Sequence, residues 1–106
     1  MTARHLVTRF AVVASLFCLL GCTSSGSLTT HQSAYECVRH AKQVLYDADF
    51  SENPVVSRET ASVSGRHGGY EATVHCDSVD QVILVDVKGL DATQSEWYRD
   101  VIIRKF

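Results

Sequence analysis

The sequence predicts a small α+β domain, and three patterns support this prediction. Apolar residues recur every three and four positions after Ser33, apolar and polar residues alternate from Tyr70 to Asp77, and a second helical pattern closes the chain. Glycine and aspartate clusters separate the strands between the helices, as in an antiparallel meander. We therefore expect an α-β-β-β-α sandwich, in which the helices cover one face of a three-stranded sheet.

The first helix is expected to begin after Ser33, because Ser33-Ala34-Tyr35-Glu36 fits a capping box. The apolar positions that follow are Ala34, Cys37, Val38, Ala41, Val44, Leu45 and Ala48. This spacing predicts an amphipathic helix of about four turns with Cys37 on its buried side. Asn53-Pro54 breaks the pattern, because the residue before a proline is disfavoured in the helical region.

Three strands are expected next. Val55 to Ser64 is rich in β-branched residues but weakly apolar, which favours the edge of a sheet. Gly65 to Gly69 contains three glycines and is expected to form a loop. Tyr70 to Asp77 alternates as a strand with one core face and one wet face, and Cys76 falls on the core face. Gln81 to Lys88 is apolar on both faces, which is typical of a strand covered on both sides.

A terminal helix is expected to follow Gly89. Thr93-Gln94-Ser95-Glu96 fits a second capping box, and Trp97, Val101 and Ile102 are spaced to form its inward side. Three basic residues near the end of the chain, Arg99, Arg104 and Lys105, are expected to interact favourably with the negative C-terminal end of the helix dipole.

The N-terminus carries the most specific signal. Arg4, His5 and Arg9 precede an apolar stretch from Phe10 to Leu20, which has the length of a signal-peptide core and is short of the roughly 20 residues that span a bilayer. The stretch ends in Leu19-Leu20-Gly21-Cys22, which resembles the lipobox of bacterial lipoproteins. Leu20 departs from the family pattern, which usually has a smaller residue there. An uncleaved membrane helix and an ordinary core helix over residues 6–20 are the alternatives.

The resemblance implies that residues 1–21 are a cleaved signal peptide and that Cys22 carries diacylglycerol. Acyl chains, at about 0.8 kcal/mol per buried methylene, would hold the protein on a lipid bilayer. Residues 22–32 are then expected to be a flexible tether and residues 33–106 a single globular domain, since Thr23 to Thr30 is polar and small. Because no aspartate follows Cys22, the segment resembles lipoproteins sorted to the outer membrane. We expect the periplasmic face of that membrane rather than the inner membrane.

Cysteine usage is consistent with this compartment. If Cys18 leaves with the leader and Cys22 is lipidated, Cys37 and Cys76 are left as a pair on the inward sides of a helix and a strand. Such a pair is expected to form one disulfide in an oxidising periplasm.

Removal of the leader also takes away Arg4 and Arg9, leaving 8 basic and 12 acidic residues, a charge of −4. Nucleic acid is therefore not expected as a partner, because phosphate binding needs clustered positive charge.

The sequence contains no pattern that predicts catalysis. His75-Cys76 would place its side chains on opposite faces of a strand, and Ser64-Gly65 lacks the glycine pattern of a hydrolase nucleophile. We therefore expect no enzyme activity, no cofactor and no metal.

Two binding roles remain. The first is a structural or protein-binding role through Val82 and Leu84, unless the protein's own helix covers them.

The second binding role is that of an inhibitor or immunity protein against a periplasmic hydrolase or toxin. In that role Arg66 and His67 would reach from the glycine loop into the active site of the target. Small size, acidity, a disulfide and a lipid anchor are typical of such proteins, although no motif specifies the role.

Overall fold

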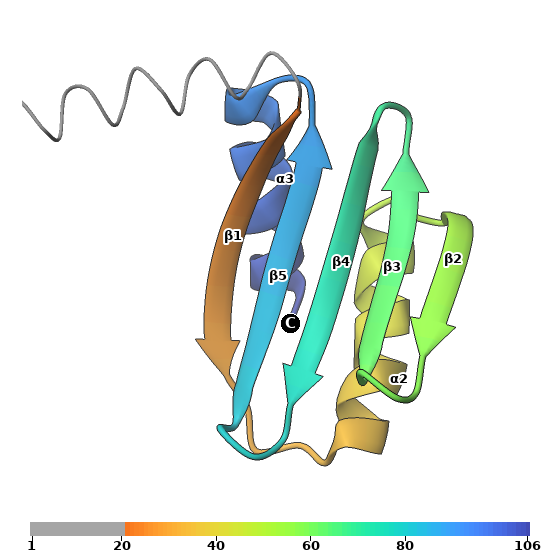
Figure 1. Ribbon diagram of the computed structural model, residues 1–106, viewed down its shortest axis with the longest axis vertical. Helices are drawn as coiled ribbons and strands as arrows, with labels where there is room; N and C mark the ends of the chain where they lie inside the picture. Colours follow the sequence, from red (N-terminus) through yellow and green to blue (C-terminus); the bar gives the residue numbers. More distant parts are fainter. Residues whose placement is uncertain (1–20) are drawn as a thin grey trace, which may run out of the picture.

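The structure, a computed structural model, describes residues 21–106 (Figure 1). The positive region, the apolar stretch and the first two lipobox positions lie outside the described residues. Within the described part the chain is α+β, as predicted, with two helices, one antiparallel sheet and a disulfide between Cys37 and Cys76. The sheet has five strands rather than three, in the order β1-β5-β4-β3-β2. In chain order the elements are β1 (Cys22–Thr29), α2 (Ala34–Asp47), β2 (Glu52–Ser57), β3 (Ser62–His67), β4 (Tyr70–Asp77), β5 (Val82–Gly89) and α3 (Ala92–Lys105).

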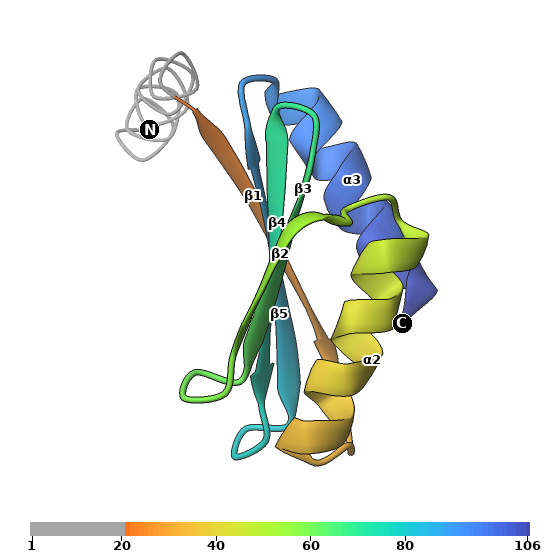
Figure 2. The same cartoon turned by 90° about the vertical axis from the view of Figure 1, so that its right-hand side faces the viewer.

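Both helices lie on the same face of the sheet, as expected (Figure 2). The core fills the space between these two layers and is built from apolar side chains at alternate strand positions and on the inward sides of the two helices, together with Phe50. Its most buried members include Leu45, Phe50, Val74, Val85, Val87 and Ile102. The opposite face of the sheet has no helix over it in the described part of the chain.

Helix α2 forms where the periodicity predicts it. The Ser33 hydroxyl accepts a hydrogen bond from the backbone N–H of Glu36 at 3.2 Å, which satisfies one of the donors left unpaired at a helix start. Cys37, Ala41, Val44 and Leu45 are its buried residues. The helix ends at Asp47, before Asn53-Pro54, because Asp49 turns the chain through a positive φ of 68°.

The prediction of a flexible tether over residues 22–32 is wrong for most of this segment. Residues Cys22–Thr29 form β1, an edge strand that pairs antiparallel with β5 along its whole length. Its serines and threonines read as a linker, yet every second residue faces the helices. Gly26 lies so close to α3 that an added Cβ would approach Ile103 to 2.7 Å, and Arg99 donates to the carbonyl of Ser25 at 3.3 Å. Pairing on one side and α3 on one face therefore order the segment despite its composition.

The expected single strand over Val55 to Ser64 is instead a hairpin, in which β2 and β3 are joined by the turn after Ser57. The expected loop over Gly65 to Gly69 is also shorter, because β3 continues to His67 and only Gly68 and Gly69 turn the chain. Gly65 serves a different purpose from a turn. A Cβ at this position would overlap the backbone carbonyl of Phe50, so glycine allows the chain before β2 to cross closely over β3.

Strand β4 matches its prediction, with Ala72, Val74 and Cys76 buried. Strand β5 was expected to be covered on both faces, and this expectation is wrong: Ile83 is buried, whereas Leu84 is 42% exposed on the uncovered face. An antiparallel sheet needs only one buried face, so apolar residues on the other face do not require a second layer.

Helix α3 differs from its prediction at its start. Asp91 is the N-cap in place of Thr93, and its carboxylate accepts a hydrogen bond from the N–H of Gln94 at 2.8 Å. The helix therefore begins earlier than predicted, at Ala92. Ile102 is buried as expected, but Trp97 is 54% exposed, and Tyr98 packs against Tyr70 in its place.

No helix in the described residues is long and apolar enough to cross a bilayer.

Candidate interaction surfaces

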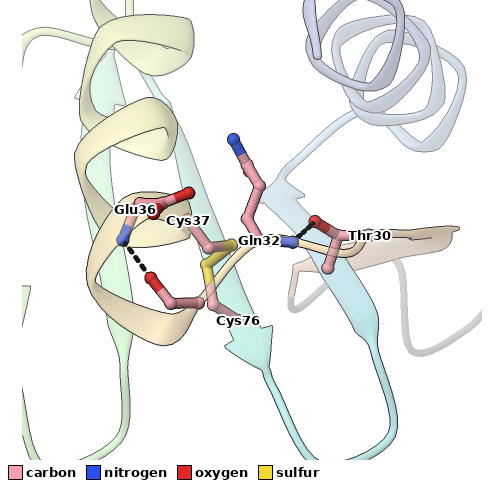
Figure 3. The surroundings of a disulfide bond; sticks show 6 residues. Thr30, Gln32, Glu36, Cys37 and Cys76 are labelled. Carbon is pink, nitrogen blue, oxygen red and sulfur yellow. Dashed lines mark hydrogen bonds between the residues drawn. A yellow bond between two sulfur atoms is a disulfide. The ribbon is translucent and has the colours of Figure 1, made fainter.

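The disulfide between Cys37 and Cys76 is confirmed (Figure 3). It joins the first turn of α2 to the end of β4, with the two Cα atoms 6.0 Å apart. Cys37 and Cys76 are both buried, so the bond lies within the core between helix and sheet. It fixes the start of α2 beside the strand, close to the point where Gln32 donates its N–H to the Thr30 hydroxyl at 3.1 Å.

Cys22, the predicted lipidation residue, is the first residue of β1. It is 4% exposed, and its Cα lies opposite Gly89 in the register of β1 with β5. Leu90, which follows Gly89, is 76% exposed at the same end of the sheet.

The structure separates Arg66 from His67, which the sequence placed together in a loop. Both belong to the end of β3, so their side chains point to opposite faces of the sheet. Arg66 forms an ion pair with Glu71 at 3.6 Å on the side without helices. His67 faces the helices, where its ring lies 5.7 Å from that of Phe50 and 5.6 Å from that of Tyr98. The two residues therefore do not form one binding loop.

Val82 and Leu84 share a face with Arg66. We call this sheet surface, on the side opposite the helices, the open face. It consists of Thr23, Ser25, Ser27, Thr29, Val55, Ser57, Ser62, Ser64, Arg66, Glu71, Thr73, His75, Asp77, Val82, Leu84, Asp86 and Lys88. Most of these side chains are small and polar, and Ser25 donates to the Asp86 carboxylate at 2.5 Å. Leu84 is an exposed apolar side chain of the open face and lies between Ser27 on β1 and His75 on β4.

Asp77 has a structural role at the end of β4. Its carboxylate accepts hydrogen bonds from the backbone N–H groups of Asp80 at 3.0 Å and Val79 at 3.1 Å, which closes the turn into β5. The hydrogen bond from the Asp80 backbone is the largest effect that lowers the pKa of Asp77 below its ordinary value of 3.8. Among the described residues, no group of histidine, cysteine and acidic side chains is placed to hold a metal ion.

A groove between α2 and β2 was not predicted. It has a volume of about 470 Å³, and Tyr35, Val38 and Val56 contribute its apolar surface. The sequence does contain a weak signal for it. Arg39 and Lys42 follow Tyr35 at helical spacing, so these three side chains share one flank of α2. Only the position of the β2–β3 hairpin shows that this flank faces another element.

Comparison with known proteins does not assign the chain to a group. No protein-family model matches it, and no curated protein matches it.

Proposed function

We propose that this chain is the precursor of a lipid-anchored protein of the bacterial cell envelope, whose mature domain binds another envelope protein and does not catalyse a reaction. Two independent features support the compartment. The Leu19-Leu20-Gly21-Cys22 sequence resembles a lipobox, and Cys37 is bonded to Cys76. A structural disulfide is typical of proteins that fold in an oxidising space such as the periplasm.

The start of β1 at Cys22 determines how such an anchor would hold the domain. Acyl chains on Cys22 would leave directly from the edge of the sheet, with no flexible spacer between lipid and fold. The domain would therefore lie against the lipid headgroups instead of standing off from them. Leu90 is exposed at this end and would face the bilayer. Thr23, in place of an aspartate, favours the periplasmic face of the outer membrane.

The observation that carries the binding role is the exposure of Leu84 on an interior strand, on the sheet face that no helix of residues 21–106 covers. An aliphatic side chain among short serine and threonine side chains offers an apolar contact on an otherwise flat polar surface. Interfaces of this kind combine a small apolar centre with a polar rim. The lipid bilayer and an envelope protein are thus the proposed partners, and nucleic acid is not.

The inhibitor or immunity role is the alternative, and the chain offers less for it. The turn that projects between β3 and β4 consists of Gly68 and Gly69, which have no side chains to enter an active site. Arg66 is paired with Glu71, and His67 packs against Phe50.

In-cell crosslinking tests the binding role. A photoreactive amino acid at position 84, in the full chain expressed in its own cells, should crosslink to the same single protein in repeated experiments. The same amino acid at position 79, in the exposed β4–β5 turn, is the matched control and should not give that product. Absence of a product at position 84, or the same product at both positions, would contradict binding through the open face.

A further inference from the structure

The groove between α2 and β2 exists because the sheet extends beyond the helix. Helix α2 packs mainly against β4 and β3, whereas β2 is the outermost strand on that side (Figure 1). Val56 pairs with Val63, so both side chains point to the face that carries the helices. Val63 is buried beneath the helical layer, but Val56 is 41% exposed. The part of β2 that extends past α2 therefore forms one wall of the groove, and the outer flank of the helix forms the other.

The groove is apolar inside and positive at its rim. Tyr35, Val38 and Val56 supply the apolar contacts, while Arg39, Lys42 and Arg58 line it with no acidic residue among them. Tyr35 is 73% exposed, so its ring is free of the core. We call these six residues the basic groove.

The basic groove is positively charged, whereas the rest of residues 22–106 has a net negative charge. Residues 22–106 carry 8 basic and 12 acidic side chains, so the rest of this segment holds 5 basic side chains against all 12 acidic ones. Within the described residues, none of Arg39, Lys42 and Arg58 takes part in an ion pair, whereas Arg66 and Arg99 do. Three cations that repel one another and lack internal partners favour an anionic ligand.

We propose that the basic groove binds an acidic, extended peptide segment of a protein partner. Carboxylates of the peptide would pair with the three cations, and arginine can hold a carboxylate through two parallel hydrogen bonds. Alternate apolar side chains of the peptide would enter between Tyr35 and Val56. As an edge strand, β2 also presents unpaired backbone N–H and C=O groups beside the groove, which an extended chain can use.

The position of the basic groove suits a protein anchored at Cys22. The groove lies near the start of α2 and the end of β2, at the opposite end of the sheet from the start of β1 and at its other edge (Figure 1). An eight-residue strand separates the two ends by about 25 Å.

The inference rests on the protein-binding part of the proposed function. It does not rest on the lipid anchor or on the open face, because the groove and Leu84 lie on different sides of the sheet.

Fluorescence anisotropy tests the proposal directly. The probe is a fluorescein-labelled peptide in which glutamate alternates with valine, titrated with the full chain in detergent. The same peptide with glutamine in place of glutamate is the control and should bind at least about tenfold more weakly. Affinity for the acidic peptide should also fall as salt is raised, because exposed charges are screened.

Charge reversal locates the binding site. Lys42→Glu and Arg58→Glu should each weaken binding of the acidic peptide about tenfold. Lys88→Glu makes the same charge change on the open face near the Cys22 end and should leave the affinity within about twofold. Tyr35→Ala, which removes an exposed ring without opening the core, should weaken binding while the thermal unfolding midpoint stays unchanged.

Three results would overturn the proposal. The first is equal binding of the acidic and glutamine peptides, and the second is an equal effect of Lys88→Glu and Lys42→Glu. The third is displacement of the peptide by anionic lipid vesicles or by inorganic phosphate, which would identify the groove as a lipid-headgroup or free-anion site. Because the crosslink at position 84 is measured separately, failure here is distinguishable from failure of the proposed partner-binding role.

Discussion

Cys37 on α2 and Cys76 on β4 are 39 positions apart in the chain and are joined in the core between helix and sheet. Closing a loop of this length removes conformational freedom from the unfolded chain, and the chain-entropy estimate of the stabilisation is about 4 kcal/mol. For a domain of fewer than 90 described residues, this is a large part of the total free energy of unfolding.

Reduction should therefore destabilise the protein strongly. We expect the unfolding midpoint to fall by about 15 °C or more when reductant is added, as measured by circular dichroism. A Cys37→Ser and Cys76→Ser double variant should melt at the reduced value with and without reductant. Equal midpoints for the oxidised and reduced wild type would show that the bond contributes no stability.

Gly65 provides a second test, because the structure requires the absence of a side chain there. Gly65→Ala should lower the free energy of unfolding by about 2 kcal/mol or more, since the new Cβ would overlap the carbonyl of Phe50. Gly69→Ala is the matched control, as a Cβ at that position meets nothing within 4 Å. Urea denaturation of both variants measures the difference, and equal losses would argue against the close crossing over β3.

Neighbouring residues of β5 should respond differently to truncation. Ile83→Ala should lower the free energy of unfolding by about 2–4 kcal/mol, because it opens a cavity in the core. Leu84→Ala should cost less than about 1 kcal/mol, because the Leu84 side chain is 42% exposed and its truncation opens no cavity in the core. Chemical denaturation of the two variants provides the comparison. A large loss for Leu84→Ala in the isolated protein would mean that its side chain is covered.

Asp77 predicts a pH dependence. Its pKa is lowered in the folded protein, so the carboxylate favours folding above the ordinary value of 3.8, and this contribution is lost as the pH falls through the lowered folded value. Asp77→Ala should therefore be less stable than wild type at pH about 7, and the difference should narrow toward pH about 3. Asp77→Asn keeps a hydrogen-bond acceptor and should fall between the two. A difference that is constant with pH would contradict the role of the charge.

The elements that sequence patterns predicted well are those with one buried and one wet side. Helix α2 and strand β4 have that property, so their periodicity located them to within a residue. The pairing of Cys37 with Cys76 followed from these two elements, because both thiols fell on inward positions. Local pattern and tertiary packing agree in such elements.

The errors occurred where tertiary contacts override composition. Strand β1 has the serine and threonine content of a linker, and pairing with β5 and packing under α3 make it a strand. Trp97 looked like a core residue, but its neighbour Tyr98 packs inward against Phe50 and Tyr70, and Trp97 is 54% exposed. Arg66 and His67 were expected to share a loop, but β3 continues through both residues. Because successive side chains of a strand point to opposite faces, the two residues are separated.

The proposed anchoring of this fold at a membrane depends on lipid attached to Cys22. Intact-mass spectrometry of the protein purified from cell membranes measures this modification. We expect a chain that begins at Cys22 and carries the added mass of a diacylglyceryl group, usually with a further acyl chain, and a Cys22→Ala variant that stays as uncut precursor. A mature protein with an unmodified Cys22, or a wild-type chain that retains residues 1–21, would contradict it.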